Sequence, residues 1–318
     1  MKPVPNLDSI REAARRIGPF AHRTPVLTSC TLDRMFNTEV FFKCENFQKV
    51  GAFKFRGACN AVFAMPSEEA TRGVGTHSSG NHAAALALSA RLRGTEAFIV
   101  MPRNAPRCKM HAVAGYGASI VYCEPSEASR REIMDGVLKE TGAVFIHSCN
   151  DPFVIAGQGT AALELLDEVP SLDVVMAPVG GGGLLSGTAL AVAGVSPQTR
   201  VIGVEPQGAD DAYRSLQEGR IVPSIDPQTV ADGLLTSLGD LTFFIISRHV
   251  EQIVTVSEEA IIAAMRHLWE RMKIVVEPSS AVPLAALLEG KIDLSGLRVG
   301  VIMSGGNADL DQLPWMRV

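Results

Sequence analysis

One lysine of the sequence stands between two phenylalanines. The stretch "GAFKFRGA" places Lys54 between Phe53 and Phe55. An amine held among apolar groups loses its charge more readily, so its pKa falls and the neutral amine can act as a nucleophile and a base. The other interpretation is a lysine whose stem covers apolar surface while its ammonium stays in water. Taken alone, the stretch favours that second interpretation.

Four consecutive glycines, Gly180, Gly181, Gly182 and Gly183, follow an apolar run and precede a helical pattern. Glycines let backbone N–H groups surround an anion, and the N-terminus of a following helix adds a partial positive charge. No lysine follows them as it does in nucleotide phosphate loops, so that class of site is disfavoured. The alternative is a tight packing turn, but the entropic cost of four glycines favours a phosphate site.

Two further turns carry polar side chains. The run Ser78-Ser79-Gly80-Asn81-His82 could hold a carboxylate through its N–H groups and hydroxyls, although serine and asparagine also favour ordinary helix caps. Ser304 begins "SGGN" after the last apolar run and could bond a ligand heteroatom, although a simple turn is the commoner reason for such a sequence. An amine nucleophile, a phosphate site and a carboxylate site are together what an amino acid bound to pyridoxal phosphate requires.

These turns lie between strand-like runs and helical patterns that alternate along the chain. The strand-like runs span 39–45, 96–102, 119–125, 143–148, 172–179, 200–206 and 298–306. The helical patterns span 81–94, 106–117, 127–142, 157–169 and 257–272, and 180–194 is expected to be a loop followed by a helix. Such alternation predicts an α/β fold with parallel sheets covered by helices. Ligands of these sheets bind beyond the carboxyl ends of the strands, where the four polar stretches lie.

The composition is that of a soluble globular protein of about two domains, with 318 residues, 47% of them hydrophobic and 20% charged. A net charge of −5 does not indicate the basic surface that nucleic-acid binding requires. The six cysteines form no C-x-x-C pair, and the N-terminus lacks a signal-peptide core. The charge-free stretch 174–199 is interrupted by Pro178 and the glycines, which argues against a membrane span. We therefore expect a cytoplasmic protein with free thiols and no membrane partner.

The chain resembles the fold-type II pyridoxal-phosphate enzymes, in the branch of serine racemases and serine/threonine dehydratases. The resemblance extends from "RTPVLTS" at Arg23 to "SGGN" at Ser304 and includes "GAFKFRGA", "SSGNH", "VIAGQGT", "GGGGLLSG", "EPQGADDAY", "ADG" and "ERMKIVVEP". It implies a fold like that of the tryptophan synthase β subunit, with two open, twisted, mostly parallel sheets. A large cofactor-binding domain would span 1–72 and 149–318, a small mobile domain 73–148, and the active site would lie between them.

The resemblance also implies a role for each motif residue. Lys54 would form the Schiff base with pyridoxal 5'-phosphate, Asn81 would bond the phenolic oxygen, and Ser304 the pyridine nitrogen. Phe53 and Gly233 would flank the ring. The complete cofactor site would be Phe53, Lys54, Asn81, Gly180, Gly181, Gly182, Gly183, Gly233 and Ser304. The substrate would be bound by Ser78, Ser79, Gly80, Asn81, His82 and Arg130.

The stretch "VEPQGADDAY" is similar to the divalent-cation site of the family. Glu205 and Asp211 would supply carboxylates and Ala209 a backbone carbonyl, and oxygen ligands suit Mg²⁺, Ca²⁺ or Mn²⁺. Without the resemblance, a solvated acidic turn would be the preferred interpretation. The family also leads us to expect a homodimer.

The implied activity is β-elimination of L-serine or L-threonine to a 2-oxo acid and ammonia, together with serine racemisation. Racemisation needs an acid/base group on the second face of the cofactor, and Ser79 is placed for it. Biosynthetic threonine dehydratases have "SAGNH" there, with alanine at the position of Ser79. A hydroxyl is a weak acid unless its surroundings tune it, so Ser79 is alternatively only part of the carboxylate loop.

Other interpretations stay open. The 3-hydroxyaspartate dehydratases share "ENFQKVGAFKFRGA", and Arg130 resembles the arginine that reaches dicarboxylates, although most such arginines lie on a helix surface. Ala84 replaces the glutamine of the nucleotide effector site, which argues against regulation by ATP. The three histidines near strand ends are expected to pack or support the site: His77, His82 and His147. A non-catalytic amino-acid sensor would lack the lysine or the glycine run, and both are present.

Overall fold

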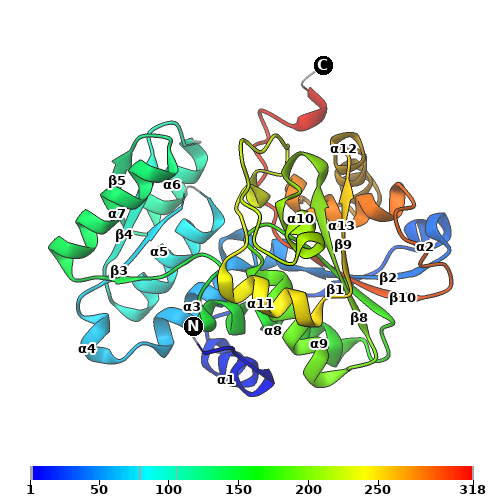
Figure 1. Cartoon of the computed structure of the whole chain (residues 1–318), viewed down its shortest axis with the longest axis horizontal. Helices are drawn as coiled ribbons and strands as arrows, with labels where there is room; N and C mark the ends of the chain where they lie inside the picture. Colours follow the sequence, from blue (N-terminus) through cyan, green and yellow to red (C-terminus); the bar gives the residue numbers. More distant parts are fainter. Residues whose placement is uncertain (1–2, 79, 106, 317–318) are drawn as a thin grey trace.

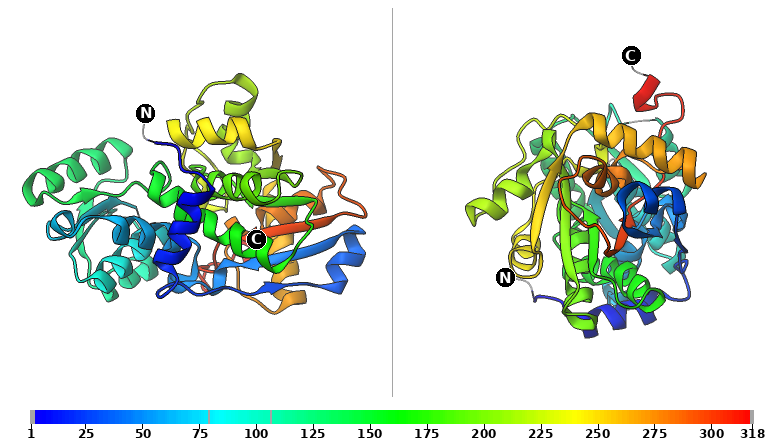
Figure 2. Two further views of the ribbon diagram at one scale, coloured as in Figure 1. Left: turned by 90° about the horizontal axis from the view of Figure 1, so that it is seen from below. Right: turned by 90° about the vertical axis from the view of Figure 1, so that its right-hand side faces the viewer.

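The protein is built around two sheets that lie side by side (Figures 1 and 2). The computed structural model describes residues 3–78, 80–105 and 107–316. The first sheet has six strands in the order β1-β2-β10-β7-β8-β9, and the second has four in the order β5-β4-β3-β6. Only β1 runs antiparallel to its neighbour within the described residues. The predicted α/β class with two mostly parallel sheets is confirmed.

The strands of the six-stranded sheet are β1 (Val26–Leu27), β2 (Glu39–Cys44), β7 (Val174–Pro178), β8 (Arg200–Pro206), β9 (Gln252–Val256) and β10 (Arg298–Met303). Those of the four-stranded sheet are β3 (Val74–His77), β4 (Ala97–Pro102), β5 (Ser119–Cys123) and β6 (Val144–Phe145). All four fall inside the segment 73–148. Its boundaries as a separate domain remain a prediction.

Helices cover both sheets. The helices are α1 (Leu7–Ile17), α2 (Cys30–Phe36), α3 (Lys54–Ala64), α4 (Ser67–Ala70), α5 (Asn81–Arg93), α6 (Arg107–Gly115), α7 (Glu127–Thr141), α8 (Pro152–Glu168), α9 (Gly183–Val195), α10 (Asp211–Glu218), α11 (Asp240–His249), α12 (Glu258–His267) and α13 (Pro278–Leu288). Helices α5, α6 and α7 pack on the four-stranded sheet. Two hydrophobic cores lie on opposite faces of the six-stranded sheet, one under α8 and α9 and one under α12 and α13.

Strand β7 shows why its sequence is apolar throughout. Val174 and Met176 belong to the core under α12 and α13, whereas Val175 and Ala177 belong to the core under α8 and α9. Successive side chains of a strand point to opposite faces, so a strand buried on both faces has no polar positions. The glycine run follows this strand, which places it at the carboxyl edge of the sheet.

Two helices differ in extent from the sequence prediction. Helix α8 begins at Pro152, five residues before the predicted start at residue 157, because Asp151 accepts hydrogen bonds from the N–H groups of Phe153 and Val154 and proline suits the first turn. The predicted helix 257–272 is α-helical only to His267, and residues Leu268–Met272 continue it as a π-helix. Neither difference moves a predicted site residue.

Helix α3 joins the two halves of the molecule. It packs on α8, which belongs to the six-stranded sheet, and on α5, which belongs to the four-stranded sheet. The contact with α8 is very close: a Cβ atom on Gly157 would lie 2.6 Å from the Cα atom of Gly57. Lys54 is the first residue of this helix, so the helix that spans both halves presents the lysine at its N-terminal end.

No helix within the described ranges is long and apolar enough to cross a membrane. Five of the six cysteines carry free thiols, and the Cys108 side chain lies outside the described atoms.

Candidate active site

The Lys54 amine is turned toward the interior of the protein. Its Nζ atom donates a hydrogen bond to the carbonyl oxygen of Ser148 at 3.1 Å and lies 5.1 Å from the centroid of the Phe53 ring. Burial lowers the pKa of Lys54 below its ordinary value of 10.5, and the nearby charges of Cys149 and Glu277 oppose this shift. A lysine with a lowered pKa holds more neutral amine at physiological pH, which is the form that attacks a carbonyl carbon.

The glycine run lies beside the segment that holds Lys54. A Cβ atom on Gly181 would lie 2.4 Å from Cys149 Sγ, and one on Gly183 would lie 3.0 Å from Cys149 Cα. Gly182 has φ +80°, a left-handed conformation that favours glycine, and it caps the N-terminus of α9. The first N–H groups of this 13-residue helix have no partner within the helix. The absence of side chains lets the loop lie against Cys149, and the N–H groups at the start of α9 that have no partner within the helix suit a phosphate group.

Gly233 lies close to the first glycine of the run. A Cβ atom on Gly180 would lie 3.0 Å from Leu234 Cα and 3.3 Å from the carbonyl oxygen of Gly233. The Gly233 N–H group donates to Ser279 Oγ at 3.1 Å, at the start of α13. The structure thus brings together the glycine run and Gly233, which are separated by about 50 residues in the sequence.

Ser304 follows the end of β10 and is 2% exposed. Its hydroxyl oxygen lies 3.1 Å from Ser280 Oγ, and its carbonyl oxygen accepts a hydrogen bond from the N–H group of Phe53 at 3.0 Å. Ser280 in turn exchanges two hydrogen bonds of 2.6 Å with the backbone of Gly305. The carboxyl end of β10 is therefore tied directly to the turn that precedes Lys54.

Asn81 connects the two sheets across the site. Its amide nitrogen donates to both carboxylate oxygens of Glu277, at 2.9 and 3.1 Å, and its oxygen accepts from Asn307 Nδ2 at 2.8 Å. Asn81 begins α5 on the four-stranded sheet, whereas Glu277 and Asn307 belong to the other half. The motifs alone do not predict a role for Glu277 or Asn307, although Glu277 stands in "ERMKIVVEP" and Asn307 in "SGGN".

The polar turn before α5 is only partly described. Ser79 lies outside the described residues; the Gly80 N–H group donates to Ser78 Oγ at 3.4 Å, and the Ser78 N–H group donates to the carbonyl oxygen of Val100. His82 is buried and its Nε2 atom lies 3.3 Å from the carbonyl oxygen of Ile146. Burial, followed by the charge of Lys54, lowers the pKa of His82 to about 3. His82 is therefore a neutral interior group, and a role in substrate binding would fall to the turn's backbone.

Arg130 lies on α7, at the four-stranded sheet. Its Nε atom is buried and has no hydrogen-bond partner among the described residues, although the side chain as a whole is partly exposed. This buried nitrogen therefore has an unmet hydrogen bond, which an anionic group could accept.

The acidic turn contains two buried carboxylates. Glu205 accepts from the N–H groups of Ala212 and Tyr213 at 3.1 and 2.8 Å, and burial together with the charge of Asp211 raises the pKa of Glu205 well above 4.5. Neither Asp211 oxygen meets a donor in hydrogen-bonding geometry within the described chain, and burial raises its pKa to about 6. Ala209 ends the adjacent 3₁₀ turn and is also buried. Two neighbouring carboxylates that favour protonation, one of them unpaired, fit a divalent cation.

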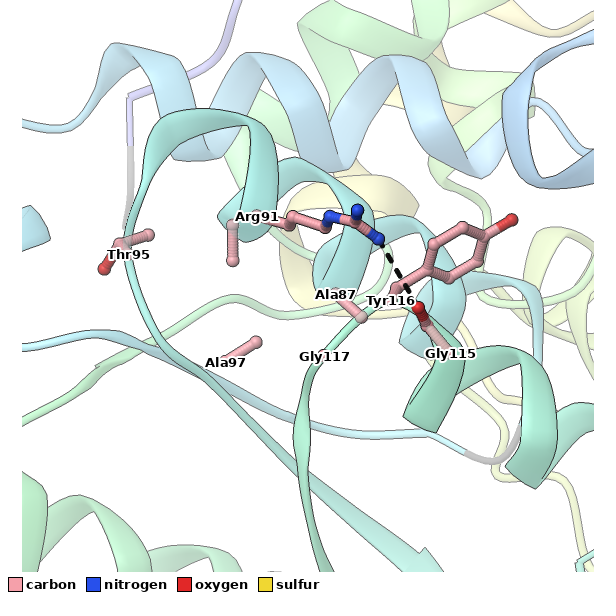
Figure 3. Close-up of a pocket in the computed structure, with 8 residues that line it drawn as sticks. Ala87, Arg91, Thr95, Ala97, Gly115, Tyr116 and Gly117 are labelled. Atoms are coloured by element: carbon pink, nitrogen blue, oxygen red, sulfur yellow. Dashed lines mark hydrogen bonds between the residues drawn. The ribbon is translucent and has the colours of Figure 1, made fainter.

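Two surface cavities lie away from these residues. One, of about 330 Å³, lies between α5 and the end of α6 (Figure 3) and is lined by Ala87, Ala90, Arg91, Thr95, Ala97, Gly115, Tyr116 and Gly117. The other, of about 520 Å³, lies between α1 and α8. Neither contains a residue of the predicted site. The glycine run, the lysine and the serine at the end of β10 thus define the candidate site by geometry rather than by cavity size.

Comparison with known proteins finds a matching family, similar proteins and similar solved structures. A family model described as "Pyridoxal-phosphate dependent enzyme" matches residues 17–305. The chain is 52% identical over 312 residues to a beta-hydroxyaspartate dehydratase of Paracoccus denitrificans, covering 98% of this chain and 99% of the relative. It is 48% identical over 313 residues to a serine racemase of Oryza sativa, covering 97% and 92%. The solved structure of maize serine racemase matches with a TM-score of 0.96 and 47% identity, covering 99% and 97%.

Proposed function

Because the chain belongs to the family of pyridoxal-phosphate dependent enzymes, we propose that it eliminates water from a β-hydroxy amino acid, after which the product takes up water again and gives a 2-oxo acid and ammonia. The predicted family is confirmed, and with it pyridoxal phosphate as the cofactor. The observation that carries the proposal is the inward-facing amine of Lys54, bonded to Ser148 and adjacent to the glycine run. When bound, pyridoxal phosphate supplies an aldehyde for amines and a ring that accepts electrons from the substrate's Cα atom.

Each residue of the site has a task in this proposal. Gly180 to Gly183 and the N-terminus of α9 bind the phosphate, and the Lys54 amine accepts the proton that leaves Cα. Phe53 and Gly233 would enclose the ring, Asn81 would bond the phenolic oxygen, and the turn 78–82 would bind the substrate carboxylate. Ser304, whose hydroxyl lies beside that of Ser280, would bond the ring nitrogen. A hydroxyl is neutral, so it would add no negative charge there. Without a negative charge beside its ring nitrogen, bound pyridoxal phosphate would be a weaker electron acceptor, which would favour loss of the β-hydroxyl group.

L-serine and L-threonine are the first substrates we propose, with pyruvate or 2-oxobutyrate and ammonia as products. The alternative is 3-hydroxyaspartate, and two observations favour it. The relative at 52% identity is named a beta-hydroxyaspartate dehydratase, and Arg130 has a guanidinium nitrogen without a partner, which suits a second carboxylate.

A substrate panel separates these proposals. The loaded enzyme is given L-serine, L-threonine and the isomers of 3-hydroxyaspartate, with and without Mg²⁺, and products are analysed on a chiral column. Arg130→Gln is the matched variant. If 3-hydroxyaspartate is the substrate, kcat/KM is highest for it and falls about tenfold or more in Arg130→Gln, while turnover of L-serine changes little. Failure of all three substrates would contradict the proposed reaction.

We further propose serine racemisation through Ser79. Ser79→Ala should lose D-serine formation from L-serine by about 10²-fold, the scale of a missing acid/base group, while keeping pyruvate formation. Ser78→Ala is the control for the turn as a whole. D-serine formation at an unchanged rate in Ser79→Ala would assign the residue to carboxylate binding alone.

We also propose that Glu205, Ala209 and Asp211 bind Mg²⁺ or another divalent cation. A cation at 100 times its Kd stabilises the folded state by about 2.7 kcal/mol. Mg²⁺ should therefore raise the Tm of the wild type and leave that of Asp211→Asn unchanged, which calorimetry would measure. Asp210→Asn is the control, because Asp210 already pairs with Arg214 at 2.7 Å. An equal shift in wild type and Asp211→Asn would contradict the site.

The remaining proposals concern the whole protein. We expect a cytoplasmic homodimer with a small-molecule substrate and no nucleic-acid or membrane partner. The segment 73–148 is proposed as the small domain that closes over the substrate, against the large domain of 1–72 and 149–318. Light scattering would test the dimer, and small-angle scattering with and without a substrate analogue would test closure.

A further inference from the structure

A buried cluster of four charged side chains lies behind the start of α3. We define the Arg56 cluster as Lys43, Glu45, Arg56 and Glu164. The side chains of Lys43, Glu45 and Arg56 are 0% exposed and that of Glu164 is 19% exposed. Two positive and two negative groups give the cluster no net charge, so its burial leaves no ion unpaired.

Arg56 is held on two edges of its guanidinium group. Glu45 accepts from Nε and Nη2 at 2.7 and 2.8 Å, and Glu164 accepts from Nη1 and Nη2 at 2.7 and 2.8 Å. Thr160 Oγ1 accepts a further bond from Nη1 at 3.2 Å. A planar group with two paired carboxylates in fixed positions has one orientation, unlike a single-point contact.

The partners come from elements that are themselves fixed. Lys43 belongs to β2, Glu45 follows the end of that strand, and Glu164 belongs to α8. The Lys43 amine donates to Glu164 Oε2 and to the carbonyl oxygen of Thr24, both at 2.7 Å. The cluster therefore locks α3 to the six-stranded sheet and to α8 at the level of its first turn.

Arg56 and Lys54 share that turn but point to different sides. Residues two positions apart lie about 200° apart around a helix. Helix α3 has no side-chain cap at its N-terminus, and its start is held by backbone N–H groups that bond Ser304 and Gln158. The Arg56 cluster adds a charged side-chain contact on the side of the helix away from Lys54.

We propose that Arg56, held by Glu45 and Glu164, is a positioning residue that sets where the Lys54 amine stands. It touches neither substrate nor cofactor in this proposal, which rests on the proposed function of Lys54. A wrong rotation of the first turn would move the amine away from the atom it must reach, and a displacement of about 1 Å can cost 10²-fold in rate.

Arg56→Lys tests the proposal, because lysine keeps the charge but cannot bond both carboxylates on two edges. We expect this variant, loaded with pyridoxal phosphate, to keep KM within about threefold while kcat falls about 10²-fold. The visible circular dichroism of the bound cofactor should also change, because it depends on the geometry at Lys54. Val62→Ala, in the same helix and fully buried, is the control: it should lower Tm without changing kcat or the dichroism.

Glu164→Gln is the second variant, at the partly exposed edge of the cluster, in case Arg56→Lys does not fold. It keeps the shape of Glu164 and should change the dichroism in the same direction, with kcat lowered about tenfold. A lowered Tm with kcat within twofold of wild type and unchanged dichroism, in either variant, would show a merely structural role and overturn the proposal. A wild type that binds the cofactor but turns over none of the panel would instead refute the proposed function, and the dichroism would still report on Lys54.

Discussion

At the scale of single residues, the surroundings of Lys54 decide its chemistry. The flanking Phe53 ring, the Ser148 carbonyl and the burial of the amine all act on one nitrogen atom. The carbonyl accepts a bond from either protonation state, whereas burial penalises only the charged one. The position therefore favours an amine that reacts over one that forms an ion pair.

Lys54 makes the stability of the cofactor-free protein depend on pH. Its folded pKa is lower than the 10.5 of the free side chain, so between these values the unfolded chain binds more protons and stability rises with pH. The variant Lys54→Met lacks the titrating amine, so this pH dependence of stability is absent from it. We expect the variant to be more stable than wild type at pH 7, with a difference in unfolding free energy that shrinks toward pH 10.5.

Urea titrations of both cofactor-free proteins between pH 7 and 9.5 would measure this difference. The matched control replaces the exposed Lys139 with methionine and reports what the loss of any lysine does. A gap between wild type and Lys54→Met that widens with pH would contradict the lowered pKa.

At the scale of elements, the glycine run lies close to Cys149 because its residues have no side chains. Gly181→Ala would place a Cβ atom 2.4 Å from Cys149 Sγ. We expect the loop to move, with a stability loss of about 1–3 kcal/mol for overpacking and at least about tenfold weaker binding of pyridoxal phosphate. Fluorescence titration of the cofactor-free protein would measure the affinity.

A double variant distinguishes the close contact from other causes. Cys149→Ala removes the sulfur, so Gly181→Ala with Cys149→Ala should recover most of the lost affinity. Gly136→Ala is the control for a glycine in open space on α7, and it should gain roughly 0.5–1 kcal/mol. If Gly181→Ala alone binds the cofactor as wild type does, the loop does not need its contact with Cys149.

The same scale explains how much could be predicted from the sequence. The strand runs and the turns after them follow from local patterns, so Lys54, Gly180 to Gly183 and Ser304 could be assigned to one edge of the sheets. Glu277 could not, because its partner Asn81 is 196 residues away and neither residue shows a periodic signal. Val50 is a β-branched residue with φ +57°, against its intrinsic preference, and only tertiary packing selects that conformation.

At the scale of the whole molecule, the Arg56 cluster links the six-stranded sheet with α3 and α8. Removing one carboxylate leaves the buried cluster with an excess positive charge, which costs about 3–5 kcal/mol. We expect Glu45→Ala to destabilise the protein by that amount in urea unfolding. Asp167→Ala is the matched control, because its pair with Arg23 is exposed and should contribute less than about 1 kcal/mol. Equal losses of unfolding free energy in the two variants would mean that the buried cluster stabilises the fold no more than an exposed ion pair does.

The segment Ser148–Cys149 is where the chain leaves the four-stranded half and returns to the six-stranded half. The Lys54 amine bonds its carbonyl group, and the glycine run packs against its cysteine. If the segment 73–148 rotates about this crossing as a small domain, atoms far from the crossing would move most and the crossing itself least. The distance between Lys54 and the glycine run would then stay constant while the four-stranded half opens or closes over the site. Access and alignment would be two independent degrees of freedom.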